Sequence, residues 1–282
     1  MMIDPLRHPT RGHGIIQLEQ SGERTVVVRA LASSPLKFLT PRNSGRAAWV
    51  FTTTFGGGFV SGDRIAIDLR VGRGATGLFS TQSSTKVYRA DRPTSQEVVA
   101  RVDEGATLIM APDATACFAG ARHRQTQEVF LEPSSGLVLF DCISSGRWAN
   151  KERWAFDRLE SQTTVWRSDK RILYESLLLD QMHGPLEARM GRFNAVAMLV
   201  VIGAPLQSLA EDLLREVGAR PIDSGDVVIV ASPLSAPSPG SPTSGALVRI
   251  AATTTEAVTN AAITRLRPLV SLLGDDPWAR KR

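Results

Sequence analysis

The chain has 282 residues, of which 43% are hydrophobic and 22% are charged, and its formal net charge is +5. This composition is typical of a soluble globular protein with one large domain or two smaller ones, stable without a disulfide or metal staple. The charge is too small and too dispersed for a nucleic-acid-binding domain. The only two cysteines, Cys117 and Cys142, exclude a disulfide framework and a cysteine-rich zinc site, and they favour a reducing compartment.

No segment is expected to enter a membrane. Residues 1–14 mix charges, prolines and glycines where a signal peptide needs an apolar core. The longest apolar run, 195–206, is interrupted by Gly203 and Pro205 and is shorter than the roughly 20 residues of a spanning helix. We therefore expect a cytoplasmic protein.

From residue 15 to about residue 180, the hydrophobic pattern has a period of two. The alternation is clearest in 65–71 and recurs in 98–102 and 127–131, which predicts half-buried β-strands. Glycine and proline separate these runs, and no dozen residues show a helical period. This part of the chain is predicted to be mainly β.

A weak internal repeat lies within the β-rich part. The segment 70–76 is echoed by 101–107, and a fainter copy begins at Leu131. In each copy, a turn of small residues joins an alternating strand to an apolar strand. Units of this size predict stacked β-sheet layers of β-helix-like character. Three ordinary hairpins with similar turn chemistry are the alternative.

The chain changes character after residue 185, where helical periods appear between apolar runs. The predicted order is β-α-β-β-α, with strands at 195–202, 226–231 and 246–252, and helices at 205–217 and 255–273, the second kinked at Pro268. A loop with four prolines, Ser232 to Gly245, is predicted to be exposed and mobile. We predict a β-rich body, 1–185, and a small C-terminal unit, 186–282, packed on it as one continuous structure.

The glycine-rich segment 55–64 has the glycine spacing of a phosphate-binding loop at Gly57 and Gly62. Such a loop continues with Lys and Ser or Thr and leads into a helix. Here Asp63 and Arg64 follow, and an alternating strand comes next. We therefore predict a tight turn between strands, in which Asp63 caps backbone amides.

Other catalytic and metal signatures are weak. No Gly-x-Ser-x-Gly elbow is present, and the histidines, at positions 8, 13, 123 and 183, lack the spacing of a helical metal site. His123 lies between two arginines and is predicted to be a surface residue.

The segment 141–156 is richer in functional groups. It places Asp141, Cys142 and Glu152 around a glycine turn, where polar groups could line a passage for hard or borderline cations. The alternative is an ordinary network in which Arg147 and Arg153 pair with the two carboxylates.

Several motifs together resemble one family. The block 55–90 contains the glycine turn, a strand, a Gly-Ala turn and the stretch Thr81-Gln82-Ser83-Ser84-Thr85-Lys86-Val87-Tyr88-Arg89. Further matching segments are 34–37, 112–122, 145–156, 178–180 and 278–280. Over nearly its whole length the chain resembles the family of the urease accessory protein UreD. It departs from the family pattern at Lys151, where glycine is usual, and at Cys142, where an aromatic residue is frequent.

The resemblance implies a non-enzymatic scaffold with a mainly β fold and a few helices. Such proteins join UreF and the GTPase UreG on apo-urease and help to deliver nickel to its active site, so GTP would bind the partner. An internal passage for nickel in transit is also implied, with no tightly bound cofactor. A passage must hold the cation with few ligands at a time, because a closed set of nitrogen and sulfur ligands would trap it.

Asp63, Asp141 and Glu152 are the predicted lining of that passage, because each is an acidic residue at a turn within the matching segments. A carboxylate lowers the electrostatic cost of a dication in a narrow space. The alternative for each residue is a structural pairing with a nearby arginine. The last helix, Thr255 to Leu273, and the basic tail after it are predicted to bind UreF.

Two readings from other classes remain. A β-rich carbohydrate-active enzyme would need paired carboxylates, either Asp141 with Glu152 or Asp63 with Asp68, at a catalytic separation. A nucleic-acid module is suggested by the basic end, Arg280-Lys281-Arg282. The phenylalanines, however, lie mostly beside apolar or glycine neighbours, unlike a strand-binding groove. We expect neither nucleic acid nor membrane as a partner.

Overall fold

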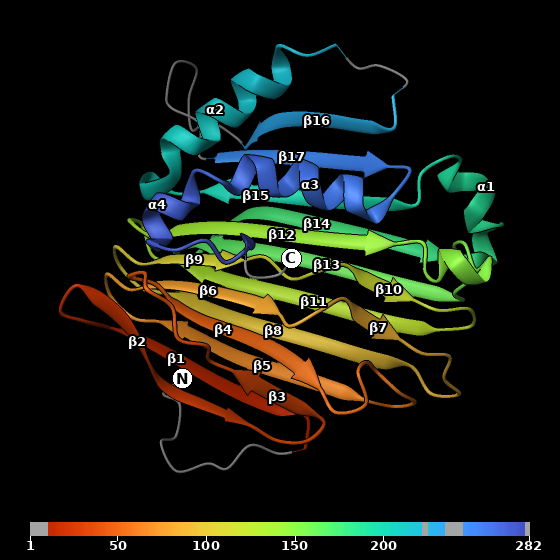
Figure 1. Ribbon diagram of the computed structural model, residues 1–282, viewed down its shortest axis with the longest axis horizontal. Coiled ribbons are helices and arrows are strands. Elements are labelled where there is room, and N and C mark those ends of the chain that lie inside the picture. Colours follow the sequence, from red (N-terminus) through yellow and green to blue (C-terminus); the bar gives the residue numbers. More distant parts are fainter. Residues whose placement is uncertain (1–10, 222–224, 235–244, 280–282) are drawn as a thin grey trace.

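The computed structural model describes residues 11–221, 225–234 and 245–279. Two large β-sheets face each other, and helices cover the outer side of the second sheet (Figure 1). One apolar core fills the space between the sheets, and a second lies between the outer sheet face and the helices. Within the described ranges, no helix is long and apolar enough to span a bilayer.

The first sheet, sheet A, has seven strands in the order β14-β13-β11-β8-β5-β1-β2. Its strands are β1 (His13–Ser21), β2 (Arg24–Ala32), β5 (Arg64–Val71), β8 (Thr94–Val102), β11 (Arg122–Leu131), β13 (Arg158–Arg167) and β14 (Lys170–Asp180). The five strands from β1 to β13 pair in parallel, and β2 and β14 close the two edges by antiparallel hairpins. Predicted strands at 65–71, 98–102 and 127–131 are therefore confirmed.

The second sheet, sheet B, runs in the order β16-β17-β15-β12-β9-β6-β4-β3, with two short strands paired beside it. Its strands are β3 (Leu36–Leu39), β4 (Ala48–Thr54), β6 (Thr76–Thr81), β7 (Thr85–Val87), β9 (Thr107–Met110), β10 (Thr115–Cys117), β12 (Gly136–Ser144), β15 (Ala195–Ile202), β16 (Val227–Leu234) and β17 (Gly245–Ala252). Its middle strands β4, β6, β9 and β12 are parallel.

The chain alternates between the two sheets, so the middle of the molecule is a stack of β-helix-like coils. Each coil runs along sheet A, turns tightly, returns along sheet B and bends back. The sequence repeat coincides with this stack, because Arg70 pairs with Arg101 and Thr76 pairs with Thr107. The third copy follows in register at Leu131, opposite Val102. The stacked arrangement is confirmed, and the alternative of three hairpins is wrong.

The connections gather at two ends of the stack. Tight turns at 72–75, 103–106 and 132–135 form one end, which we call the turn end. The longer connections from sheet B to sheet A form the other end, which we call the loop end, and consist of residues 55–63, 82–93, 111–121 and 145–157 together with 181–194. In Figure 1 the loop end is the side that carries α1 (Leu186–Met190).

The C-terminal part follows the predicted order of elements. Strand β15 adds to sheet B beside β12, and β17 and β16 continue the sheet outward. Its helices are η3 (Ala204–Leu206), α2 (Gln207–Gly218), α3 (Thr255–Leu266) and α4 (Leu269–Leu273). The last predicted helix is interrupted at Pro268, as expected. The boundary at residue 185 stays a prediction.

Two predicted features lie partly or wholly outside the described residues. The ends of the predicted loop 232–245 belong to β16 and β17, and its middle lies outside the description. The basic tail 280–282 lies wholly outside it.

Candidate functional site

Polar side chains interrupt the apolar core between the sheets at corresponding positions of neighbouring strands. On sheet A, Gln96 of β8 lies beside Gln125 of β11, which lies beside Ser161 of β13. Valines and leucines occupy the same inward face further along these strands. The register thus places amide and hydroxyl groups side by side inside the molecule, where polar groups need internal partners.

Asp141 of β12 reaches this polar group from the opposite sheet. The Gln125 Nε2 atom donates to both carboxylate oxygens of Asp141, at 3.0 and 2.8 Å, and the Ser161 hydroxyl donates to one of them at 3.0 Å. The Thr115 hydroxyl donates to the Gln125 Oε1 atom at 3.3 Å. Thr115 of β10 in turn lies beside Thr85 of β7. We call Thr85, Gln96, Thr115, Gln125, Asp141 and Ser161 the polar row.

Burial raises the pKa of Asp141 above its ordinary value. Protein atoms surround the carboxyl group and disfavour its charged form. The hydrogen bonds from Ser161, Gln125 and the Cys142 amide oppose the effect and do not cancel it. A cation beside Asp141 would shift this balance toward the carboxylate.

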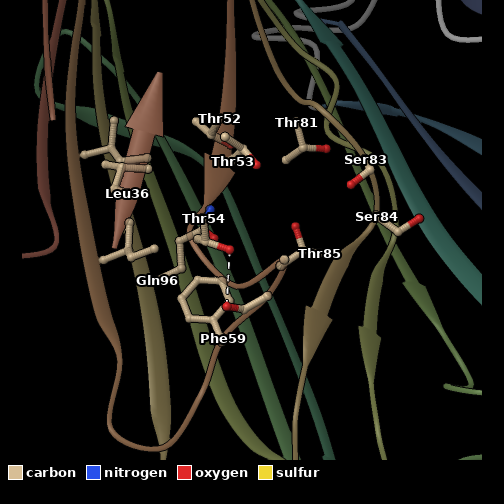
Figure 2. Close-up of a pocket in the computed structure, with 14 residues that line it drawn as sticks. Leu36, Thr52, Thr53, Thr54, Phe59, Thr81, Ser83, Ser84, Thr85 and Gln96 are labelled. Atoms are coloured by element: carbon tan, nitrogen blue, oxygen red, sulfur yellow. Dashed lines mark hydrogen bonds between the residues drawn. The ribbon is translucent and has the colours of Figure 1, made fainter. Parts of the chain in front are cut away.

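At one end of the polar row, Thr85 and Gln96 line a narrow cavity of about 40 Å³ near the loop end. Hydroxyl groups of Thr54, Thr81, Ser83, Ser84 and Thr85 surround it (Figure 2). Gln96 forms one wall, and Phe59 closes the bottom in the view of Figure 2. The volume accommodates a few water molecules, since one water needs roughly 10–15 Å³ on this measure.

The second end of the polar row borders a larger cavity of about 390 Å³ between sheet A and the β15–β17 part of sheet B. Asp141 and Ser161 line it, and most of its other walls are aliphatic. At its rim, the Arg249 guanidinium contacts the Glu175 carboxylate at 2.6 Å and thereby joins the two sheets. The polar row therefore connects the walls of two separate cavities.

The donor chemistry of the polar row suits weak, changing contacts with a cation. It offers hydroxyl and amide oxygens and one carboxylate, a hard to borderline ligand set. No group of three His, Cys, Asp or Glu side chains able to hold a metal occurs in the described part of the chain. Cys117 and Cys142 are free and buried, and burial raises the pKa of both thiols, which disfavours the thiolate that binds metals.

Asp63 performs the structural role predicted for it. Its carboxylate accepts a hydrogen bond from the Val60 amide at 2.9 Å and holds the glycine loop, while β5 follows directly. Gly57 and Gly62 have positive φ angles of 71° and 78°, which a side chain would strain. A strand follows the loop where a phosphate-binding loop would lead into a helix.

Glu152 is held by the loop around it. The Arg147 guanidinium donates to it, with an Nε–Oε2 distance of 3.0 Å, and the Ala119 amide donates at 3.2 Å. The pKa of Glu152 is lowered, first by the Arg147 hydrogen bond. This part of the predicted pairing is confirmed, whereas Arg153 pairs with Glu187 at 3.1 Å and not with Asp141.

The three predicted lining residues are therefore not brought together. Asp141 lies within β12, so its predicted location at a turn is wrong, and it belongs to the polar row. Asp63 and Glu152 bind different parts of the loop end. A glycosidase would need Asp141 paired with Glu152, or Asp63 paired with Asp68. In the described ranges neither pair shares a hydrogen-bond partner. Asp141 accepts from Gln125, Glu152 from Arg147 and Asp63 from the Val60 amide, while Asp68 contacts His13 at 2.8 Å.

His123 is buried, with 4% of its surface exposed, so the predicted surface location is wrong. Strand β11 alternates, and His123 shares the inward face with Gln125. Its Nδ1 atom contacts the Thr94 hydroxyl at 2.8 Å, and its ring packs against Phe59 with the ring centres 5.0 Å apart. Its Nε2 atom has no partner among the described residues, and burial lowers the pKa of His123 to about 4.

This pKa predicts a loss of stability in mild acid. Below pH 6.5 the unfolded chain takes up a proton at this position, whereas the folded chain does so only near pH 4. The free energy of unfolding should fall by about 2 kcal/mol between pH 7.5 and pH 5 through this group alone. The measurement is urea unfolding of the wild type and His123→Phe at both pH values. An equal pH dependence in both proteins would contradict the assignment.

Sequence comparison places the chain among known proteins. A family model described as "UreD urease accessory protein" matches residues 10–280. The chain is 46% identical over 270 residues to a urease accessory protein UreD of Sorangium cellulosum, covering 96% of this chain and 84% of that protein. It is 36% identical over 272 residues to a urease accessory protein UreD of Anaeromyxobacter, covering 95% and 89%. With a urease accessory protein D of Arabidopsis thaliana it shares 33% identity over 291 aligned positions, covering 94% and 99%.

Proposed function

Since the chain belongs to the UreD family of urease accessory proteins, we propose that it is a scaffold in urease maturation that helps convey nickel to the urease active site. Its proposed partners are UreF, the GTPase UreG and the urease structural subunits. Nickel is its cargo and not a resident cofactor. The names of its relatives support an accessory role and not a catalytic one.

The polar row is the observation that carries the nickel proposal. Its six side chains lie beside the apolar core between the sheets, and they link the walls of the two cavities. Polar groups in such a core reduce stability relative to apolar ones, so their presence calls for a function. Oxygen and amide ligands hold nickel loosely, which favours movement over storage.

Asp141 supplies the only carboxylate of the polar row. Its raised pKa indicates that the protein surroundings disfavour the negative charge there. A passing dication would compensate that charge, so Asp141 would attract nickel most strongly while nickel is adjacent. Gln125 and Ser161 hold the carboxylate in position between the sheets.

The glycine loop supports assigning nucleotide hydrolysis to a partner. A nucleotide-binding loop has a lysine after its last glycine and leads into a helix. Here Asp63 follows Gly62, and the next element is strand β5. The energy-coupled step would then belong to UreG, and this chain would receive and guide the metal.

The test is urease assembly in cells that express urease and its accessory proteins with and without this chain. At fixed, limiting nickel, we expect deletion to lower both urease activity and the nickel content of purified urease. Restoring the chain from a plasmid should restore both. Unchanged activity and nickel content on deletion would overturn the proposal.

A further inference from the structure

The connections of the loop end form one continuous surface. The Gly62 amide donates to the Arg92 carbonyl at 3.2 Å, and the ring of Tyr88 packs against Phe118 at 5.2 Å. The Gly120 amide donates to the Ala155 carbonyl at 3.1 Å, and Trp154 donates from Nε1 to the Phe193 carbonyl at 2.8 Å. These contacts link all the loops side by side and give the loop end a defined shape.

Large apolar side chains project from this surface. Phe55 is 62% exposed, Val60 50%, Trp148 63% and Met182 89%. The four residues come from three different connections of the loop end. Aromatic residues and methionine are enriched in the centres of protein interfaces.

The loop end also carries cations that are not neutralised by a neighbouring acid. Lys86, Arg89, Arg92, Lys151 and Arg189 are exposed and form no ion pair within the described ranges. The exposed acids Asp91 and Asp157 of the loop end are fewer than these five cations. Glu152 and Glu187 are already paired with arginines. The unpaired charge of the loop end is therefore positive.

The turn end, in contrast, carries both signs. Its connections hold the acids Glu23, Asp103, Glu104, Glu132 and Asp169 together with the exposed cations Arg24, Arg42, Arg46, Arg73 and Lys170, and Asp103 is already paired with Arg70. The excess of unpaired positive charge is therefore a feature of the loop end, where the four exposed apolar residues named above also lie. Such a charged patch attracts an approaching acidic protein and raises its rate of association.

We propose that the loop end is the docking surface for a protein partner with an acidic face, with Trp148 and Met182 as apolar anchors. The other candidate, helix α3, packs Val258, Ala262 and Leu266 against sheet B and borders a cavity of about 510 Å³. The loop end differs from it in combining large projecting apolar side chains with unpaired cations. A stable contact of about 800 Å² per partner fits a surface built from all five connections.

This inference rests on the proposed function and adds the place at which nickel enters this chain. The hydroxyl-lined cavity has Gly57 and Ser84 of the loop end in its wall. A free dication would be repelled by the surrounding cations. An acidic partner would neutralise them, cover the cavity and transfer the metal without releasing it to solvent.

The experiment measures binding of the purified chain to a UreF-like protein, a UreG-like protein and apo-urease, each titrated separately. The loop-end variants are Trp148→Ala, Met182→Ala and the double variant Arg92→Glu/Lys151→Glu. The matched control is Arg73→Glu/Lys170→Glu, which changes the net charge equally at exposed residues of the turn end. Circular dichroism melting verifies that every variant is folded.

For one of the three partners, we expect at least a tenfold loss of affinity in the charge-reversed loop-end variant and in Trp148→Ala. We also expect weaker binding at 300 mM than at 50 mM salt, with the control like the wild type. Equal binding by all variants, or an equal loss in the turn-end control, would overturn the docking site and leave the proposed function intact. Absence of wild-type binding to all three partners would overturn both.

Discussion

Trp154→Ala is expected to lower the free energy of unfolding by about 4 kcal/mol, within the range for a large aromatic residue removed from a core. Trp154 has no exposed surface and packs against Phe156, with ring centres 6.0 Å apart. Its Nε1 atom donates to the Phe193 carbonyl at 2.8 Å, and its own carbonyl accepts from Gln181 at 2.6 Å. One residue therefore fixes both 145–157 and 181–194.

The matched control lies six residues earlier. Trp148 is 63% exposed, so Trp148→Ala should change stability by no more than about 0.5 kcal/mol. Urea unfolding followed by circular dichroism measures both variants. Similar stability losses in the two variants would show that Trp154 does not anchor these connections.

The sequence repeat predicted the stacked coils because each copy carries the same turn chemistry. Gly74 and Gly105 adopt positive φ angles of 69° and 67°, and Ala75 and Ala106 are fully buried beside them. A larger side chain at either alanine would collide with the neighbouring coil. Local sequence therefore determined where the chain turns, and the spacing of the copies determined the register of the parallel strands.

The polar row could not be predicted in the same way, because it depends on register between strands far apart in sequence. Gln125 and Asp141 come from different sheets and meet only when β11 and β12 stack face to face. A partial signal was present. Leu137 and Leu139 define the inward face of β12, and the same alternation continues to Asp141.

His123 lies inside the protein and not on its surface for a related reason. Its neighbours Arg122 and Arg124 indicate a surface segment, whereas alternation from Val129 and Leu131 back along β11 places His123 and Gln125 inside. Periodicity was the better guide than local charge. A polar residue on the apolar side of an alternating strand was the sign of the candidate site.

Asp141→Asn is expected to separate nickel transfer from folding. Because burial raises the pKa of Asp141, the ionised carboxylate reduces stability as pH rises from acid to neutral, and the neutral amide removes that effect. The variant should therefore be at least as stable as the wild type at pH 7.5. The introduced amide, the Gln125 amide and the Ser161 hydroxyl can reorient to keep their hydrogen bonds.

The nickel loading of urease, unlike the stability of this chain, should fall in the Asp141→Asn variant. Two unit charges about 4 Å apart interact by about 4 kcal/mol at an effective dielectric constant of about 20, so losing the only carboxylate of the polar row should slow nickel transfer at least tenfold. The measurement is the nickel content of urease matured with each variant at limiting nickel, together with recovery of the urease–accessory complex. Asp103→Asn serves as the matched control, since Asp103 pairs with Arg70 at the turn end, away from the polar row and the docking surface, and its loss should leave nickel transfer unchanged. Wild-type nickel content with Asp141→Asn, or loss of the complex along with the nickel, would exclude Asp141 from the route.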